Sequence, residues 1–395
     1  MEKKTIIVAF GGASPEHEVS VLTAHQAIAA LQEDSPYEIV PLYITKSGRW
    51  LTGNPLLELK NFEHLTKTEN DSIPCSFVQN RYGATVLRIE KKGIFSGAEE
   101  VQPYVVLNAF HGSSGENGAF QGICELYNIP CTGSGVTASA VGMDKVMTKR
   151  LCRSAGIPVV EWVDFHEQEW IEREKALTEQ IETLGYPAVV KPVHLGSSIG
   201  IKIVRNRESL ILAVEEAFRY DSHLLVEKAV HPLTEINCSV LGSAKEYRVS
   251  VCERPLGTQE LLSFQDKYMS DESSKGMASA SRVIPADIPA ELASKIQESA
   301  GSVYGLIGCN GLARLDFLLE KGTENYFFNE INTIPGSFSF YLWKESGIAF
   351  SELLKKLIDL AVEDQRKKNR RIRSYETNLL SRKAVKGIKG LKGTK

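Results

Sequence analysis

The sequence has few cysteines and no long apolar segment, and both shortages narrow the classes of protein to which it can belong. Its seven cysteines among 395 residues stand at irregular spacings and include no C-x-x-C pair. This argues against a disulfide framework or a zinc site and favours a reducing, cytoplasmic location. No apolar run approaches the roughly 18–20 residues of a membrane span, so we expect none. The apolar residues 5–10 lack a small-residue cleavage site, which predicts a first strand and not a signal peptide.

The net charge of −3 conceals a strongly basic C-terminus. Residues 366–395 contain twelve Lys and Arg and one Glu, so this segment carries +11 and the rest of the chain −14. Its glycines alternate with lysines, which predicts a disordered tail. A basic tail is able to contact nucleic acid or an anionic membrane. We expect instead a solvated extension and no nucleic-acid partner.

The order of predicted elements indicates an α/β protein of two or three domains, since 395 residues exceed one typical domain. A strand that ends at Gly11-Gly12 precedes a helix expected over 16–32 and a strand over 37–45. The apolar run 105–110 predicts another buried strand, which ends in a glycine-rich turn over 111–118. This βαβ alternation predicts an open sheet with ligands at the carboxyl ends of its strands. Residues 82–89 and 93–95 suggest a small inserted hairpin.

From Ser134 the pattern changes to shorter helices and strands. We expect helices over 143–155, 167–184 and 207–219, strands over 188–192, 201–204 and 224–228, and then a mostly antiparallel region. This region ends in a hairpin over 312–332.

The predicted hairpin carries three oxygen donors. Asp316 lies two residues after Arg314, and Asn332 two residues after Glu330, so each pair points to one face of its strand. With the turn near Gly322, Asp316, Glu330 and Asn332 converge. Mg²⁺ prefers oxygen ligands, and an arginine beside it is able to neutralise charge on a transferring phosphoryl group. A hairpin with solvated acidic residues would show the same pattern.

A glycine-serine loop follows the strand that ends at Lys191-Pro192. Gly196, Ser197 and Ser198 allow backbone N–H groups to approach phosphate oxygens. It is not a Walker A loop, because the lysine precedes the glycines, and an ordinary hairpin turn has the same composition.

Other charged residues fit a nucleotide site. A buried Lys191 needs an anionic partner such as a phosphate, and Lys145, which opens a helix, supplies a second positive charge. Glu227 and Glu235 flank a strand end. They are either carboxylates that bind adenine or ribose or ordinary surface charges.

In this order the motifs resemble those of the ATP-grasp enzymes, specifically the D-alanine–D-alanine ligase family, from Thr5 to about Val362. The residues that carry the resemblance are Gly11-Gly12-x-Ser14-x-Glu16-His17-Glu18-Val19-Ser20, His111-Gly112-x-x-Gly115-Glu116-x-Gly118, Gly133-Ser134-Gly135-Val136 with Met143-Asp144-Lys145, Lys191-Pro192 with Gly196-Ser197-Ser198, Lys267-Tyr268, Arg314-x-Asp316 and Asn329-Glu330-x-Asn332-Thr333-x-Pro335-Gly336.

The resemblance implies an ATP-grasp fold of three domains. An N-terminal open parallel α/β domain (1–132) binds substrate, and ATP lies between a central domain (133–227) and a C-terminal catalytic α+β domain (228–365), before the tail (366–395). It implies that ATP phosphorylates one D-alanine and that a second attacks the acyl phosphate, in peptidoglycan precursor synthesis. It also implies Mg²⁺, two ions in number with Mn²⁺ as an alternative, and a homodimer.

The resemblance also implies roles for individual residues. Metal ligands match Asp316, Glu330 and Asn332, and ATP-binding residues match Lys145, Lys191, Gly196, Ser197, Ser198, Glu227, Lys228 and Glu235. Glu16 matches the carboxylate that holds the first ammonium group, with His111 beside it, and Arg314 and the Gly336 N–H match groups that support the reacting centre. Ser197 and Tyr268 match residues linked to Glu16 when a loop closes, and Lys267 in that loop faces the phosphates.

The segment after Gly336 departs from the family. It reads Ser337-Phe338-Ser339-Phe340-Tyr341-Leu342-Trp343 and is about three residues shorter than usual, so Ser337, Ser339 or Tyr341 would have to bind the acceptor. An ATP-grasp ligase for another amino acid or amine is therefore an alternative. A non-catalytic nucleotide-binding protein is disfavoured because the metal ligands, the two lysines and Arg314 remain. A dinucleotide-binding dehydrogenase fits poorly, since Gly11-Gly12-Ala13 lacks the G-x-G-x-x-G spacing. Tyr268 in place of a histidine favours an amino-acid acceptor over D-lactate.

Overall fold

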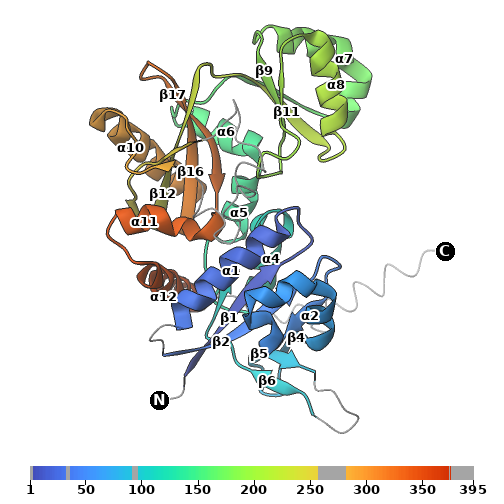
Figure 1. The fold of residues 1–395 in the computed structure, drawn as a ribbon, viewed down its shortest axis with the longest axis vertical. Helices are drawn as coiled ribbons and strands as arrows, with labels where there is room; N and C mark the ends of the chain where they lie inside the picture. Colours follow the sequence, from blue (N-terminus) through green and yellow to red (C-terminus); the bar gives the residue numbers. More distant parts are fainter. Residues whose placement is uncertain (1–2, 33–35, 91–96, 257–281, 373, 375–395) are drawn as a thin grey trace, which may run out of the picture.

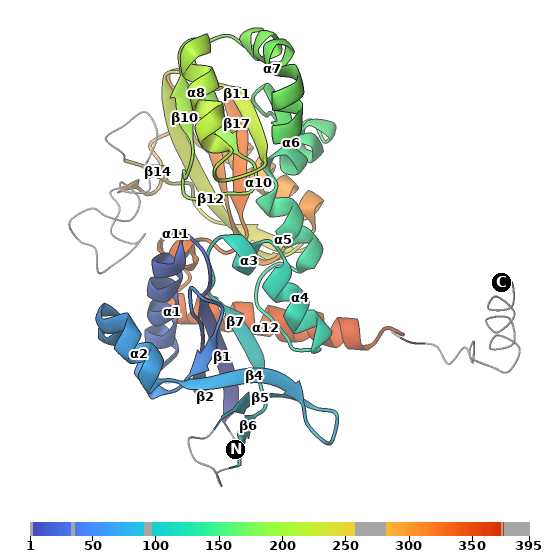
Figure 2. The ribbon, with the colours of Figure 1, turned by 90° about the vertical axis from the view of Figure 1, so that its right-hand side faces the viewer.

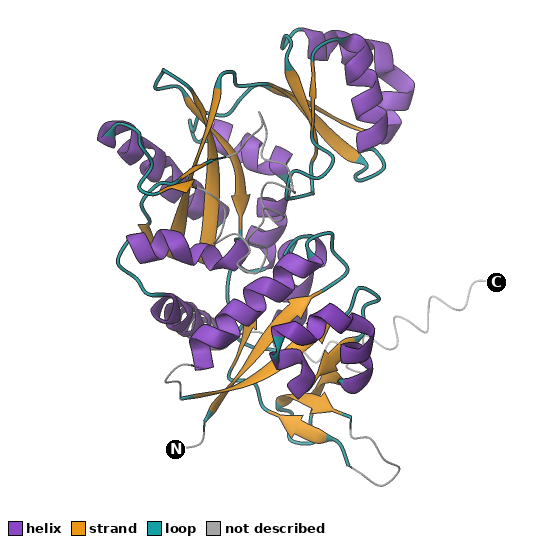
Figure 3. Cartoon of the chain, viewed as in Figure 1, coloured by secondary structure: helices purple, strands orange, loops and turns teal. Residues whose placement is uncertain are grey.

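The computed structural model describes residues 3–32, 36–90, 97–256, 282–372 and 374. Lys267 and Tyr268, the predicted strand over 93–95 and most of the basic tail (373 and 375–395) lie outside the described residues. The three larger sheets of the described residues follow one another along the long axis of the molecule, each with its own helices (Figures 1 and 3).

The N-terminal sheet has seven strands in the order β6-β5-β4-β3-β2-β1-β7. Its elements are β1 (Lys4–Gly11), α1 (His17–Gln32), β2 (Tyr37–Ile44), β3 (Trp50–Thr52), the 3₁₀ turns η1 (Asn54–Leu57) and η2 (Leu59–His64), α2 (Leu65–Asp71), β4 (Ile73–Gln79), β5 (Thr85–Ile89), β6 (Glu99–Val101), β7 (Val105–Asn108), α3 (Ser113–Glu116) and α4 (Ala119–Leu126). The predicted parallel sheet is confirmed for β2-β1-β7. The pairings from β2 to β6 are antiparallel. The short connection from β2 to β3 explains this, because a parallel pairing needs a crossover of a dozen or more residues.

Strand β1 is buried on both faces, as its apolar run predicts. Ile6, Val8 and Phe10 pack in one cluster with α1 and α12 (Phe350–Asn369), whereas Ile7 and Ala9 pack in another with α4. Helices therefore cover both sides of the strand (Figure 2), and its carboxyl end, at Gly11, lies where α1 begins.

One strand of the predicted inserted hairpin is present, and the other, over 93–95, lies outside the described residues. Strand β5 matches the predicted 82–89 segment, but it pairs with β4 and β6. Strand β4 was not predicted, although Cys75 and Phe77 are buried and alternate with exposed neighbours.

The central sheet is antiparallel, with the order β10-β9-β11-β8. It is formed by β8 (Trp162–His166), β9 (Ala188–Pro192), β10 (Lys202–Val204) and β11 (His223–Lys228), and its helices are α7 (Glu167–Glu182) and α8 (Arg207–Ala217). Ala188 and Val190 of β9 pack with the helices, and the alternate residues Val189 and Lys191 line a cavity. The two-residue period of a strand thus sends Lys191 toward the neighbouring sheet.

The C-terminal sheet is antiparallel in the order β13-β12-β16-β17. Its elements are β12 (Leu233–Ser243), β13 (Tyr247–Val249), α10 (Ala290–Ile307), β16 (Asn310–Glu320) and β17 (Tyr326–Asn332), followed by η4 (Gly336–Ser339) and α11 (Phe340–Glu345). Helices α5 (Val136–Met143) and α6 (Lys145–Ser154) lie beside it, and β14 (Arg254–Pro255) pairs with β15 (Arg282–Val283).

Helix α12 returns the chain to the N-terminal sheet, where its apolar face joins the cluster around α1. It continues to Asn369, so the first four residues of the predicted tail, 366–369, are helical. Among the described residues, no helix combines the length and the apolar character that crossing a membrane would require.

Candidate active site

A cavity of about 990 Å³ lies between the central and C-terminal sheets. Of the residues that the sequence suggested for ATP, five line it: Lys191, Ser198, Glu227, Lys228 and Glu235. Two of the suggested metal ligands, Asp316 and Glu330, line it too. The cavity thus has apolar walls such as Val189 and Leu318 and a charged end, which is the composition that a nucleotide needs.

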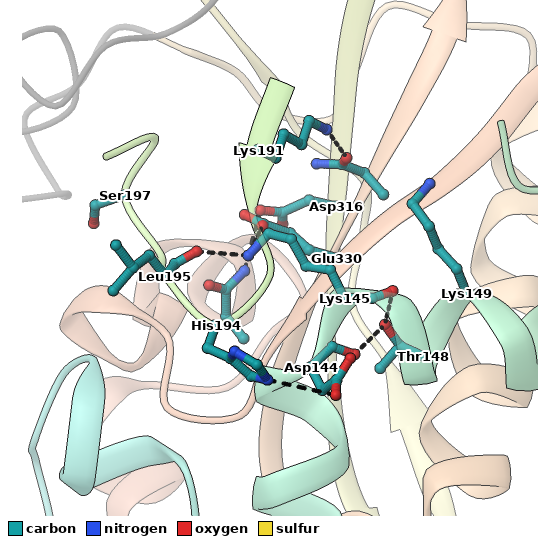
Figure 4. Close-up of polar contacts among 12 residues, drawn as sticks. Asp144, Lys145, Thr148, Lys149, Lys191, His194, Leu195, Ser197, Asp316 and Glu330 are labelled. Carbon is teal, nitrogen blue, oxygen red and sulfur yellow. Dashed lines mark hydrogen bonds and ion pairs between the residues drawn. The ribbon is translucent and has the colours of Figure 1, made fainter. Parts of the chain in front are cut away.

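Three charges are buried together beside this cavity, and two of them, Glu227 and Lys191, line it. Glu227 is 1% exposed, and its carboxylate pairs with Lys191 and, at 2.9 Å, with Lys149. Burial raises the pKa of Glu227, but the two lysines outweigh that effect and hold the pKa at about 2. Lys191 Nζ also donates to Asn329 Oδ1 at 3.0 Å (Figure 4).

Lys149 was missed by sequence reasoning, although a signal exists. It follows Lys145 by four residues in α6, so both lysines lie on the same face of the helix. Lys145 Nζ lies 3.3 Å from Glu330 Oε2 of β17 in the C-terminal sheet, and it donates to Leu195 O of the central domain at 2.6 Å (Figure 4).

The hairpin β16–β17 has the predicted register. Asp316 lies opposite Glu330, and Arg314 lies opposite Asn332. Arg314 Nε and Nη2 donate to the two carboxylate oxygens of Asp316, each at 2.7 Å, and Asn332 Nδ2 donates to Asp316 Oδ2 at 3.2 Å. The two carboxylates therefore pair here with the protein's own cations.

The donor set fits a magnesium ion bound together with phosphates. It offers two carboxylates and one amide oxygen, and Mg²⁺ commonly takes one or two carboxylates plus phosphate oxygens. The described residues contain no group of three His, Cys, Asp or Glu side chains that would hold a metal ion alone. The set thus suits an ion that arrives with a nucleotide and not a permanent metal centre.

The substrate end of the site lies where β1 and β7 end. Glu16, just before α1, accepts a hydrogen bond from Ser197 Oγ of the glycine-serine loop. Gly112 has a φ angle of 65°, which favours glycine, and a Cβ atom there would lie 2.4 Å from Glu16 Oε2. Gly196 also lies close to this carboxylate. Ser197 and Ser198 have φ angles of 52° and 59°, which residues other than glycine rarely adopt.

His111 is buried in the turn after β7. Its Nε2 lies 2.8 Å from Thr23 Oγ1, which accepts a hydrogen bond from the backbone N–H of Ser337 at 3.0 Å. Burial lowers the pKa of His111 to about 4, so the ring is neutral at physiological pH.

Glu116 is a second residue that sequence reasoning did not assign. Its carboxylate accepts from Gly112 N at 2.7 Å and from Ile334 N at 3.3 Å, and so joins the turn after β7 to the loop after β17. Burial, and then the charge of Glu16, raise its pKa to about 8. Its position in the predicted glycine-rich turn was the available signal.

The segment after Gly336 is a tight turn whose three residues Ser337, Phe338 and Ser339 have φ angles of 52°, 51° and 44°. Gly336, Ser337 and Ser339 are buried, and Ser339 Oγ has no hydrogen-bond partner among the described residues. Phe338 is buried in the core around α1. The turn is therefore anchored by the Phe338 side chain and by the backbone N–H of Ser337, which donates to Thr23.

Tyr341 belongs to a network that reaches the hairpin. The Arg282 guanidinium lies 3.7 Å from the centre of its ring, and its hydroxyl donates to Glu253 Oε1 at 3.3 Å. Arg282 also pairs with Glu253 Oε2 at 2.7 Å, and Glu253 bridges to Asn237, which lies opposite Asp316. Sequence reasoning missed Arg282 and Glu253.

The central and C-terminal sheets close on a charged cavity. One contributes a glycine-serine loop and the other a hairpin that carries carboxylates, and this arrangement defines a protein of the ATP-grasp class. Comparisons with known proteins specify the family. Residues 5–134 match the family model for the D-ala D-ala ligase N-terminus, and residues 151–359 match that for the C-terminus.

Individual proteins agree with these family models. The chain is 37% identical over 377 residues to the D-alanine–D-alanine ligase of Thermosipho africanus, which covers 95% of this chain and 98% of that protein. The D-alanine–D-alanine ligase structure from Coxiella burnetii matches with a TM-score of 0.79 and 29% identity over 96% of this chain and 100% of that one. The VanG D-Ala:D-Ser ligase from Enterococcus faecalis matches with a TM-score of 0.75 and 33% identity over 91% and 100%.

The chain belongs to the D-alanine–D-alanine ligase family. It is accordingly an ATP-dependent ligase, an enzyme class that uses ATP and a divalent metal ion.

Proposed function

We propose that this enzyme joins two D-alanine molecules to D-alanyl-D-alanine, for peptidoglycan precursors, through an acyl phosphate. One observation carries the proposal: a single loop touches both halves of the site. Ser197 pairs with Glu16, Ser198 lines the nucleotide cavity, and Leu195 O holds Lys145, which pairs with Glu330. An amino acid whose ammonium group pairs with Glu16 would have its carboxylate beside the terminal phosphate of ATP.

The nucleotide would occupy the cavity between the two sheets. Its adenine and ribose would lie near Lys228 and Glu235, and its phosphates near Lys145, Lys191 and the N–H groups of the loop that begins at Gly196. Asp316, Glu330 and Asn332 would hold Mg²⁺, and we propose two ions, with Mn²⁺ as a substitute. When bound, the metal neutralises the charge of the phosphates.

In the first step a carboxylate oxygen of D-alanine attacks the γ-phosphorus, and ADP leaves. In the second, the amino group of the other D-alanine attacks the carbonyl carbon, and phosphate leaves with that carboxylate oxygen. Arg314 would stabilise the acyl phosphate and the Gly336 N–H the tetrahedral oxyanion, while His111 supports Glu16. Lys267 and Tyr268, outside the described residues, would close over the site and exclude water from the acyl phosphate.

The acceptor would bind beside Tyr341, with Ser337 and Ser339 shaping the turn beneath it. The buried ring, held by Arg282 and Glu253, would leave room for a small amino acid. We further propose three domains (1–132, 133–227 and 228–365), a homodimer and a cytoplasmic location.

The test is phosphate release from ATP and Mg²⁺ with D-alanine, L-alanine, D-serine or D-lactate, singly and in pairs, with products identified by mass. D-Serine is included because a D-Ala:D-Ser ligase is among the similar structures. Dependence on D-alanine with formation of the dipeptide supports the proposal. ATP cleavage with D-alanine that yields only a mixed product would make another amine the acceptor.

A further inference from the structure

An imidazole at the base of the glycine-serine loop lies between two carboxylates. His194 directly precedes Leu195, and its Nδ1 lies 2.9 Å from Asp221 Oδ2, while its Nε2 lies 3.5 Å from Asp144 Oδ2 (Figure 4). Its backbone N–H also donates to Asp221, at 2.8 Å. An imidazole donates from both nitrogens only when both carry a proton. The geometry therefore suits a charged ring.

Both carboxylates are fixed by backbone groups. Asp144 caps α6, because its Oδ1 accepts from Met147 N at 2.8 Å. Asp221 Oδ1 accepts from His223 N at 3.1 Å, at the start of β11. His194 thus connects the loop to the helix that carries Lys145 and Lys149 and to the strand that carries Glu227.

Lys145 holds the same stretch of chain from the inside. Its backbone N–H donates to Val193 O at 3.3 Å and its Nζ to Leu195 O at 2.6 Å. Successive residues 193–195 are therefore attached to the N-terminus of α6, with His194 on the solvent side and Lys145 on the cavity side. Beyond this attachment, the loop reaches Glu16 through Ser197.

We propose that His194 is a positioning residue that, as an imidazolium between Asp144 and Asp221, holds the glycine-serine loop where it binds ATP phosphates and reaches Glu16. The proposal rests on the function proposed above. In it, His194 contacts neither ATP nor D-alanine and acts through the loop.

The charged groups around His194 determine the pH range over which its ring stays protonated. Asp144 faces it from α6 and Asp221 from the turn before β11, and the His223 ring of β11 lies 6.1 Å away. His223 in turn contacts Asp164 at 3.3 Å and stacks on His166 of β8. Hydrogen bonds to Asp144 and then Asp221 outweigh partial burial and raise the pKa of His194 to about 9. Both ring nitrogens donate at neutral pH, and one of these hydrogen bonds is lost as the pH rises through about 9. The backbone N–H of His194 still donates to Asp221.

The first test replaces His194 with Gln, which keeps one amide donor but removes the charge. ADP affinity, measured with Mg²⁺ by calorimetry on the full chain at pH 7.5, should fall about tenfold, the size expected for lost hydrogen bonds between charged groups. The kcat/KM for ATP should fall similarly, while KM for the acceptor D-alanine stays constant. His64→Gln, at an exposed histidine of the N-terminal domain, is the matched control and should behave as the wild type.

The second test measures how kcat/KM for ATP decreases at alkaline pH, which is the alkaline limb of its pH profile. It should lie near pH 9 in the wild type, be absent in His194→Gln, and move about one unit toward neutrality in Asp144→Asn. Asp144→Asn retains the oxygen that caps α6, so it carries the test even if His194→Gln does not fold. Wild-type ADP affinity in His194→Gln, or an unshifted limb in Asp144→Asn, overturns the proposal. A wild type that binds ADP but forms no dipeptide contradicts the proposed ligation, and the ADP measurement still decides the role of His194.

Discussion

Ser197 Oγ donates a hydrogen bond to the carboxylate of Glu16, 181 residues earlier in the chain. The contact joins the loop of the central sheet to the start of α1 in the N-terminal domain. Glu16 is buried, so this hydrogen bond fixes the position of its carboxyl group at the point where an ammonium group is expected.

Ser197→Ala should weaken the use of D-alanine and spare nucleotide binding. The Glu16 carboxylate would lose a donor, and we expect kcat/KM for D-alanine to fall about tenfold. Steady-state kinetics with each substrate varied in turn, together with ADP calorimetry, separate the two effects. Unchanged D-alanine kinetics would show that Glu16 does not hold the donor.

Glu330→Gln and Asp316→Asn should each abolish turnover in a protein that still folds, and Asp316→Asn should be the less stable of the two because it leaves Arg314 buried beside a neutral amide. Both lie on the cavity wall, where we propose that they hold a metal ion, and neither is part of the apolar core. Phosphate release measures the activity, and circular dichroism with thermal melting measures the fold. An active variant would contradict the metal assignment, and an unfolded one would make the residue structural.

Glu227→Gln should destabilise the protein by about 3–5 kcal/mol, because Lys149 and Lys191 would remain buried without their counter-charge. Glu161→Gln, which disrupts an exposed pair with Arg153, should cost less than about 1 kcal/mol and serves as the control. Urea unfolding gives both values.

The difference between wild type and Glu227→Gln should also depend on pH. The pKa of Glu227 is about 2 in the folded state, below its unfolded value. The stability that it contributes is thus present above about pH 4.5 and lost as the pH falls toward 2. A difference that stays constant over this range would contradict the ion-pair account.

Glu116→Gln should weaken the dependence of the free energy of unfolding on pH between about 4.5 and about 8. The pKa of Glu116 is raised to about 8 in the folded state, so unfolding releases its proton at neutral pH. The free energy of unfolding of the wild type should therefore fall as the pH rises from about 4.5 to about 8. Parallel curves for variant and wild type, from urea titrations at several pH values, would contradict the raised pKa.

Tyr341→Ala should mainly raise KM for the acceptor D-alanine. Tyr341→Phe keeps the ring against Arg282 and loses only the hydroxyl contact with Glu253, so it should have a smaller effect. Separate KM values for the two D-alanine sites come from fitting the dependence of rate on D-alanine concentration. If neither variant changes the acceptor KM, the acceptor binds elsewhere.

The register of the metal hairpin was predictable because it depends on local rules. Alternation placed Arg314 with Asp316 and Glu330 with Asn332, and the turn near Gly322 paired the strands. The helix after Gly12 and the strand that ends at Lys191 follow from equally local patterns.

Residues that depend on packing between distant segments were not predictable in this way. Glu116 gains its role from Ile334, 218 residues later, and Glu253 gains its role from Arg282 and Tyr341. Strand β4 was missed as well, because only Cys75 and Phe77 of its seven residues are buried. Lys149 was recoverable from its spacing to Lys145.

The most direct test of the central claim follows one oxygen atom. With D-alanine labelled with ¹⁸O in its carboxylate, ATP and Mg²⁺ in unlabelled water, the released phosphate should contain one ¹⁸O per molecule of dipeptide formed. This is the oxygen that attacked the γ-phosphorus and left when the second amino group attacked. Dipeptide formed with unlabelled phosphate would contradict an acyl phosphate intermediate, and with it the roles given to Glu16, Arg314 and the metal hairpin.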